Sequence, residues 1–403
     1  MHLAYIPLYL LLAGLVLYTV LGGADFGAGV WELTARNDEE VRGHAVHAMG
    51  PVWEANHVWL IFVLVVLWTA YPVAFASIAS TLAIPLFVAA IGIILRGTAY
   101  ALRGGAYSNR ELAAIDTVFS ISSILTPFAL GAAAGAVASR RVPVGNAAGD
   151  LVSTWLNPTS LMIGALAVTA GAYLAAVFLA ADAVRRGQPK LEQEYRLRAL
   201  AAGVVAGALA LAAIIVVHSD AKPLYHGLVH GRGVVALVAS IAGGVATLAL
   251  VVARRYEPAR FTGAIAVAAI IAGWALAQSP LLLPGLTVDQ AAAPRDTLIA
   301  LTVAALAGAV ILVPSLWLLF RLYLQGRFDP EWTNLPGPPP HPRTVMAASG
   351  TGLAWRIAAV LLAAGFVLTT IADAAWAHAV GVACLLGFVA VAFPATATPP
   401  QSG

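Results

Sequence analysis

The chain has 403 residues, of which 61% are hydrophobic and 10% are charged, and its formal net charge is +3 at pH 7. An ordinary soluble domain is about one quarter charged, and no soluble core could bury apolar runs that extend from one end of the chain to the other. The composition therefore indicates an integral membrane protein with several spans. Its basic residues lie singly or in pairs between these runs, where they orient a membrane chain and form no nucleic-acid-binding surface.

Eleven runs are apolar enough to cross a bilayer, which takes about 20 residues. In chain order they lie at 6–33, 51–72, 77–102, 113–138, 159–183, 199–217, 233–253, 261–282, 297–322, 354–373 and 376–394. The hinge between the second and third, around Tyr71 and Pro72, is very short. The last two are closely linked around Asp373 and form either two spans or one helical hairpin. The sequence predicts an all-α polytopic membrane protein.

A polar linker divides these spans into two groups. Residues 326–352 contain Leu335-Pro-Gly-Pro-Pro-Pro-His-Pro, which is too polar and proline-rich to span a bilayer or to form a helix. We therefore predict a core bundle of about nine spans at 1–325, a cytoplasmic linker at 326–352, and two additional spans with a tail at 353–403.

The distribution of Lys and Arg predicts the orientation of the chain. With the N-terminus outside, the inner loops carry fifteen of these residues and the outer loops carry five, while Arg96 and Arg356 lie within spans. Because cytoplasmic loops are enriched in Lys and Arg, we expect an outer N-terminus. An odd number of spans then places the C-terminus in the cytoplasm.

The first span ends in a glycine-rich segment that contains one carboxylate. Gly23 and Gly27 are four residues apart, a spacing that lets a neighbouring backbone approach closely, and we interpret these glycines as helix-packing positions. Asp25 lies roughly two turns, about 12 Å, before the cytoplasmic end of its span. An ionisable group at this depth is costly and suggests a functional site.

The second span begins with a polar segment in which Trp53, Glu54, Asn56 and His57 follow one another closely. Glu54 and His57 are three residues apart and share one helix face, while Trp53 and Asn56 share another. Glu54 is either a first-turn acid favoured by the helix dipole or a group that transfers protons. His57 either forms a hydrogen bond within the bundle or orients such a group.

The third span carries Arg96 about two turns before its cytoplasmic end. Asp25, Glu54 and Arg96 thus lie at similar depth on three consecutive helices, and Asp116 begins the fourth span near that level. Buried charges need partners, and these residues supply them. Two hypotheses follow: a structural ion pair that orders the bundle, or a polar relay that admits protons from the cytoplasm.

The stretch from Gly22 to Arg103 resembles the N-terminal region of subunit II of the cytochrome bd-type quinol oxidase family. The matching motifs are Gly-x-Asp-Phe-Gly-x-Gly at the end of the first span, Pro-Val-Trp-Glu-Ala-Asn-His-Val-Trp-Leu at the start of the second, and Thr-Ala-Tyr-Pro at its close. The resemblance continues more weakly to about Gly326 and does not cover the residues beyond.

The resemblance implies a nine-helix body that pairs with a homologous subunit I in a bacterial cell membrane. In the family, subunit I carries the quinol-binding loop and the ligands of two b-type haems and haem d, and the complex oxidises quinol and reduces oxygen to water. Subunit II stabilises subunit I and supplies part of a proton route from the cytoplasm. We expect no cofactor on this chain alone, because none of its histidines is placed to face another across two spans.

The resemblance also implies roles for the polar residues. Glu54 and Asp25 match the relay acids of the family, and Arg96 is expected to be their counter-charge. The residues expected to orient the relay or to contact the partner are Trp53, Asn56, His57 and Trp59. The chain departs from the family at two of these positions, since many members have Asp in place of Glu54 and Glu or Gln in place of His57.

Two alternative functions are a secondary transporter and a purely structural partner subunit. A transporter would show paired broken helices in both halves, with polar groups near the middle of the membrane. Here the acids gather near one face, and the second half is almost free of charge within its spans. The structural subunit differs from the oxidase subunit with a proton route only in the role of Glu54.

Overall fold

The computed structural model describes residues 3–35, 40–41, 43–45, 53–103, 109–324, 353–370 and 374–397. It divides into two compact units, Met1–Leu316 and Trp317–Gly403. Nearly all of the described chain is helical. By length and composition, eight of the described helices are able to cross a membrane, and shorter apolar helices accompany them. The predicted all-α polytopic fold is therefore confirmed.

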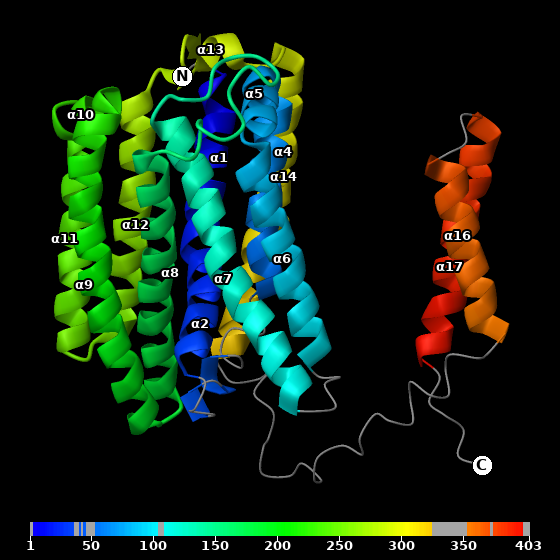
Figure 1. The fold of residues 1–403 in the computed structure, drawn as a ribbon, viewed down its shortest axis with the longest axis horizontal. Helices are drawn as coiled ribbons and strands as arrows, with labels where there is room; N and C mark the ends of the chain where they lie inside the picture. The colour runs from blue at the N-terminus through cyan, green and yellow to red at the C-terminus, as the bar shows by residue number, and fades with distance from the viewer. Residues whose placement is uncertain are drawn as a thin grey trace. The chain divides into compact units, whose positions relative to one another are not determined.

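The first unit is a bundle whose long helices run alongside one another (Figure 1). Its elements are α1 (Tyr5–Leu17), the π-helical turn η1 (Tyr18–Gly22), α2 (Gly23–Thr34), α4 (Trp53–Ala70), α5 (Pro72–Thr81), α6 (Ala83–Arg103), α7 (Asn109–Ala138), α8 (Pro158–Arg185), α9 (Pro189–Asp220), α10 (Lys222–Val229), α11 (Val234–Val252), α12 (Tyr256–Gln278), α13 (Val288–Ala291) and α14 (Arg295–Leu324), the last of which runs past the end of the unit.

The third predicted span, 77–102, is wrong in one respect, because two helices take its place. The first, α5, begins with Pro72 directly after the one-residue hinge at Tyr71, and it ends at Thr81. The second, α6, begins at Ala83. Proline has no N–H and clashes with the carbonyl four residues before it. Pro85 therefore prevents one continuous helix through Thr81, and the chain bends at Leu82.

A short β-hairpin follows α12, at a place where the sequence predicted more helix. The strands β1 (Leu281–Leu283) and β2 (Leu286–Thr287) are antiparallel, with Leu281 opposite Thr287. The predicted span 261–282 is displaced accordingly, since α12 begins at Tyr256 and ends at Gln278. The residue before a proline is pushed away from helical geometry, so Pro280 explains the early end of α12.

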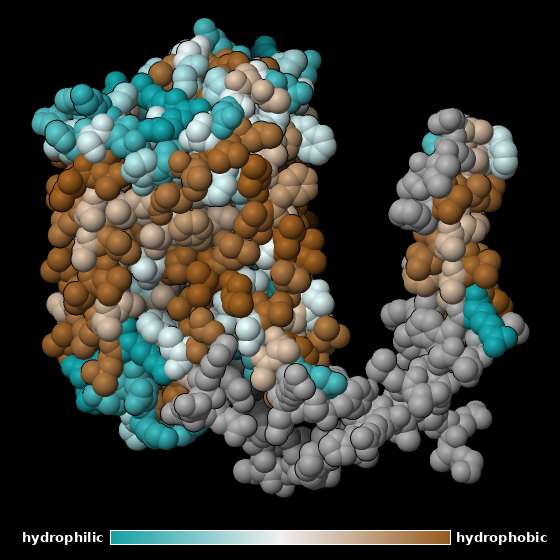
Figure 2. All heavy atoms as spheres, in the orientation of Figure 1, coloured by the Kyte–Doolittle hydropathy of each residue, from teal (hydrophilic) through white to brown (hydrophobic). Residues whose placement is uncertain are grey.

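The surface of the first unit has the polarity expected of a bilayer-spanning bundle. Figure 2 shows a hydrophobic belt across the middle of its visible face, with hydrophilic residues towards both ends. Large apolar side chains are well exposed on several helices, among them Phe87, Ile215 and Val235, which are 69%, 72% and 74% exposed. Such a surface would be a liability in water, whereas lipid tails solvate it.

Glycine contacts place α2 in the interior of the bundle, where it packs between α7 and α8 (Figure 1). A Cβ atom added at Gly27 would lie 2.1 Å from the backbone oxygen of Gly171, and one added at Gly171 would lie 2.6 Å from the backbone oxygen of Gly23. Trp31 fixes the same contact by donating from Nε1 to the backbone oxygen of Ala172 at 2.8 Å. The two helices therefore touch backbone to backbone.

The second unit contains the helices α16 (Leu353–Thr370) and α17 (Ala375–Ala397), which pack against each other as a helical hairpin. A Cβ atom added at Gly365 would lie 2.7 Å from Cγ of Leu385. The last two predicted spans therefore correspond to one closely packed helix pair.

Candidate functional site

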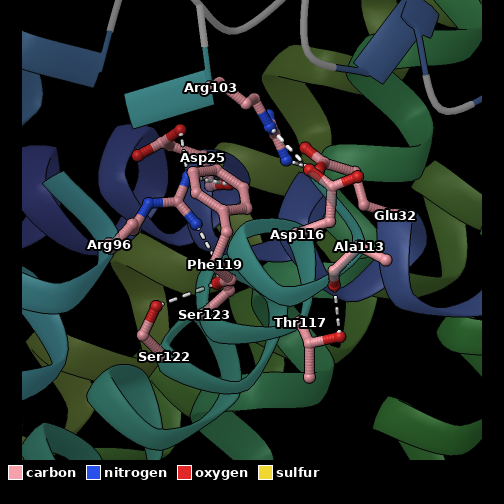
Figure 3. Close-up of polar contacts among 10 residues, drawn as sticks. All are labelled: Asp25, Glu32, Arg96, Arg103, Ala113, Asp116, Thr117, Phe119, Ser122 and Ser123. Atoms are coloured by element: carbon pink, nitrogen blue, oxygen red, sulfur yellow. Dashed lines mark hydrogen bonds and ion pairs between the residues drawn. The ribbon is translucent and has the colours of Figure 1, made fainter. Parts of the chain in front are cut away.

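A buried ion pair joins the first span to the third. Arg96 donates from Nη2 to Oδ1 of Asp25 at 2.6 Å and to the backbone oxygen of Asp25 at 2.9 Å. Both side chains are 2% exposed. Arg96 also donates from Nη1 to Oγ of Ser123, so that α2, α6 and α7 meet at one point (Figure 3). We call Asp25, Arg96 and Ser123 the deep layer.

A second charged layer lies nearer to the end of the same three helices. Arg103 donates from Nη2 to Oε2 of Glu32 at 2.5 Å and from Nε to Oδ1 of Asp116 at 2.8 Å. Its side chain is 13% exposed, and that of Glu32 is 2% exposed. One guanidinium thus bridges two carboxylates (Figure 3). We call Glu32, Arg103 and Asp116 the end layer.

The two layers are related by a spacing of seven residues on every helix. The pairs are Asp25 and Glu32 on α2, Arg96 and Arg103 on α6, and Ser123 and Asp116 on α7. Seven residues make about two helical turns, or roughly 10 Å. The residue numbers fall from the deep layer to the end layer on α7 and rise on α2 and α6, so α7 is antiparallel to the other two helices.

The ring of Phe119 lies between the two guanidinium groups. Its centroid is 4.2 Å from Cζ of Arg96 and 4.5 Å from Cζ of Arg103. Arg96 also lies 4.9 Å from the ring centroid of Phe26. Cations are attracted to the faces of aromatic rings at such distances. The rings therefore stabilise two like charges that would otherwise repel each other in an apolar interior.

The glycine-rich segment has a second use besides helix packing. A Cβ atom added at Gly29 would lie 2.2 Å from Oγ of Ser123 and 2.9 Å from Nη1 of Arg96. No other residue at this position leaves room for the deep layer. The motif Gly-x-Asp-Phe-Gly-x-Gly thus combines a packing glycine, Gly27, the acid Asp25, and a glycine that admits the arginine.

The beginning of α4 faces the first span. Asn56 is 2% exposed and donates from Nδ2 to the backbone oxygen of Leu21 at 3.3 Å. The ring of His57 lies between two rings of the first span, with centroid distances of 6.3 Å to Tyr18 and 6.1 Å to Phe26. Both residues thus contact the helix that carries Asp25.

Three other expected site residues lie elsewhere or are only partly described. Trp59 packs edge to face on Phe62 within α4, with ring centroids 6.4 Å apart. The backbones of Trp53 and Glu54 form the first turn of α4, but their side chains lie outside the described residues. The structure therefore brings Asp25 and Arg96 into contact, places Asn56 and His57 beside them, and describes no contact of Glu54.

Sequence reasoning missed Glu32 and Phe119. Its third predicted span, 77–102, stopped just before Arg103, which is the last residue of α6 and is largely buried. The seven-residue spacing of acids on α2 and of arginines on α6 was a usable signal. Once Asp25 is paired with Arg96, the same spacing on both helices predicts that Glu32 and Arg103 meet.

The two layers together form a series of carboxylates that begins near the helix ends and continues to Asp25. Carboxylates are able to accept and release protons, whereas a guanidinium stays charged. Among the described residues, Oδ2 of Asp25 has no hydrogen-bond partner, so one oxygen of this acid is available to a mobile proton carrier. The arrangement suits proton transfer between one end of the bundle and its interior.

A family model, a curated relative and a solved structure all point to the same protein family. The family model described as "Cytochrome bd terminal oxidase subunit II" matches residues 3–323. The chain is 31% identical over 111 residues to cytochrome bd ubiquinol oxidase subunit 2 of Bacillus subtilis (strain 168), a stretch that covers 28% of this chain and 33% of that relative. Its structure is similar to a chain of the bd oxidase from Geobacillus thermodenitrificans, with a TM-score of 0.63 and 26% identity over 80% of this chain and 99% of the other.

Proposed function

Because the chain belongs to the cytochrome bd terminal oxidase subunit II family, we propose that it pairs with a haem-bearing subunit I and supplies protons from the cytoplasm for the reduction of oxygen to water. Quinol is the electron donor in this proposal. The complex lies in the bacterial cell membrane and contributes to the proton-motive force. In this proposal the chain acts as one subunit of the oxidoreductase, and subunit I completes the active site.

The observation that carries this proposal is the succession of two charged layers on α2, α6 and α7. The end layer offers Glu32 and Asp116, and the deep layer offers Asp25 about two turns further in. A purely structural bundle gains little from buried ion pairs, because desolvation of the charges can exceed their mutual attraction. Two such layers in line are better explained by proton supply than by stability.

The haems are expected on subunit I. A haem with two axial histidines needs them on opposite sides of its ring. In the described part of the chain, the histidines that approach each other are His226 and His230, with centroids 5.6 Å apart. Both are exposed and follow one another on a single segment at the end of α10, so they do not fit a haem within the bundle. In this proposal the proton route ends at the neighbouring subunit I.

The test of the proton role is Glu54→Gln in the assembled complex. This substitution keeps the size and hydrogen-bonding capacity of the side chain and removes its titration. We expect oxygen consumption to fall on the order of 100-fold or more, as for the loss of a proton-transferring group, while haem content and the reduction of the haems by quinol stay near parental values. Glu54→Asp, the matched control, should retain much of the activity.

Parental turnover of Glu54→Gln across pH 6–8 would contradict the proton role. If Asp25→Asn in the deep layer also turned over at the parental rate, the chain would be a purely structural partner subunit, and its charged layers would serve assembly alone. Spectra of the haems before and after addition of quinol separate this outcome from a defect in electron entry.

The proposed orientation, with the N-terminus outside and the C-terminus in the cytoplasm, is tested by cysteine labelling. Ala253 follows α11 on the side assigned to the cytoplasm, and Ser219 lies near the end of α9 on the opposite side; both residues are exposed. With Cys384 replaced by Ala, we expect a membrane-impermeant maleimide to label Ser219→Cys in intact cells and Ala253→Cys only after lysis. The reverse pattern would contradict the orientation.

A further inference from the structure

Polar groups continue along the first span beyond Asp25, towards the middle of the membrane. Tyr18 is 6% exposed, Asn56 is 2% exposed and Asp25 is 1% exposed. Within the part of the chain that the structure describes, Oη of Tyr18, Oδ1 of Asn56 and Oδ2 of Asp25 have no hydrogen-bond partner. Buried polar groups are nearly always paired with protein or with ordered water, so these three atoms on two adjacent helices are candidates for binding ordered water.

Tyr18, Asn56 and Asp25 all lie at, or next to, the turn formed by residues Tyr18–Gly22. The ring of Tyr18 occupies the space that a side chain at position 22 would fill, since a Cβ atom added at Gly22 would lie 3.1 Å from Cε2 of Tyr18. Gly22 and Asp25 are three residues apart and are therefore neighbours on the helix surface. Asn56 approaches the same turn, because it donates to the backbone oxygen of Leu21.

The backbone of this turn is not an ordinary α-helix. Tyr18 to Gly22 form the π-helical turn η1 between α1 and α2. Such turns are rare and are often found at functional sites. On the side of α4, the ring of His57 packs against the rings of Tyr18 and Phe26. The π-turn and Gly22 together place the Tyr18 ring against the turn that directly precedes Asp25.

We propose that ordered water bridges Tyr18, Asn56 and Asp25, and that the Tyr18 hydroxyl passes protons from Asp25 further into the membrane. A buried water needs two to four polar partners, and the three groups provide them. In each transfer protonated Asp25 gives its proton to the bridging water, the water gives one proton to the Tyr18 hydroxyl oxygen, and Tyr18 gives its own proton to a water molecule on the far side of the hydroxyl. Tyr18 therefore stays neutral overall and needs no oxidant or reductant. This inference rests on the proposed proton-supply function.

The test is Tyr18→Phe in the complete oxidase, because it removes one oxygen atom and leaves the ring in place. We expect oxygen consumption to fall on the order of 100-fold and its solvent deuterium isotope effect to rise, at unchanged haem content and unchanged haem reduction by quinol. Tyr173→Phe is the matched control. Tyr173 is also a buried tyrosine of a spanning helix, but its ring packs on Gly203 of α9, so its turnover and isotope effect should stay parental.

Gly22→Ala provides a second variant that keeps the hydroxyl but moves it, since the new methyl group meets the Tyr18 ring. Slowed turnover with a raised isotope effect at normal haem content would support the proposal even if Tyr18→Phe assembled poorly. Parental turnover of both variants, beside a slow Glu54→Gln enzyme, would overturn the role of Tyr18 and leave the proton-supply function standing. Parental turnover of all three variants and of Asp25→Asn would overturn both.

Discussion

Arg96→Met is expected to abolish most of the assembled oxidase. The substitution leaves the carboxylate of Asp25 buried without its cation, and breaking a buried ion pair in this way costs about 3–5 kcal/mol. It also removes the hydrogen bond to Ser123 and the contacts with the rings of Phe26 and Phe119. The yield of haem-containing complex after detergent extraction and its thermal unfolding temperature measure the effect.

Two further variants make this prediction specific. Arg232→Met alters an exposed arginine in the segment before α11 and should behave as the parent. The double variant Asp25→Asn/Arg96→Met removes both charges, so it should recover part of the lost stability although the proton route stays interrupted. If Arg96→Met assembled and unfolded like the parent, the deep layer would not be needed to hold α2, α6 and α7 together.

Gly27→Ala is expected to have the second-largest effect, although it adds a single methyl group. The new Cβ would overlap the backbone of Gly171 and Ala172 on α8, and backbone atoms are unable to rotate away as a side chain does. The helices α2 and α8 must separate, and overpacking of this kind costs about 1–3 kcal/mol or more. The separation also moves Asp25, so we expect lower thermal stability and lower turnover together.

Gly207→Ala and Gly244→Ala are the matched controls for this substitution. Both glycines lie inside spanning helices, α9 and α11, and a Cβ added at either position meets no atom within 4 Å. Alanine also favours the helix by roughly 0.5–1 kcal/mol relative to glycine. The two controls should therefore be neutral or slightly stabilising. An equal loss of stability in all three variants would contradict the backbone contact between α2 and α8.

The sequence was sufficient to predict most of the spans of the first unit and the meeting of Asp25 with Arg96. Both conclusions depend on hydrophobic length and on depth within a span, which can be counted along the chain. The break at Leu82 could also have been predicted, because it depends on Pro85 and local sterics. The continuous apolar run across Leu82 instead suggested a single helix. The π-turn at Tyr18 could not have been predicted, since the residues that form it are compatible with an ordinary α-helix.

The end layer escaped prediction for a different reason. Depth alone places Glu32 and Arg103 near the ends of their spans, where charged residues are usually solvated. Their pairing depends on how α2 and α6 are rotated about their axes, and that rotation is set by contacts between helices. The role of Gly29 is hidden in the same way, because only the neighbouring Arg96 and Ser123 show that no side chain fits there.

The two charged layers have a mechanical consequence that follows from α7. Ser123 contacts Arg96 and Asp116 contacts Arg103, and both belong to this one helix. An α-helix is stiff along its axis because every turn is bonded to the next. A sliding movement of α7 past α2 and α6 would therefore strain both contacts at once, and neither layer could loosen while the other stayed locked. The two charged layers thus hold α7 against α2 and α6 at two points, so that neither layer can move independently of the other.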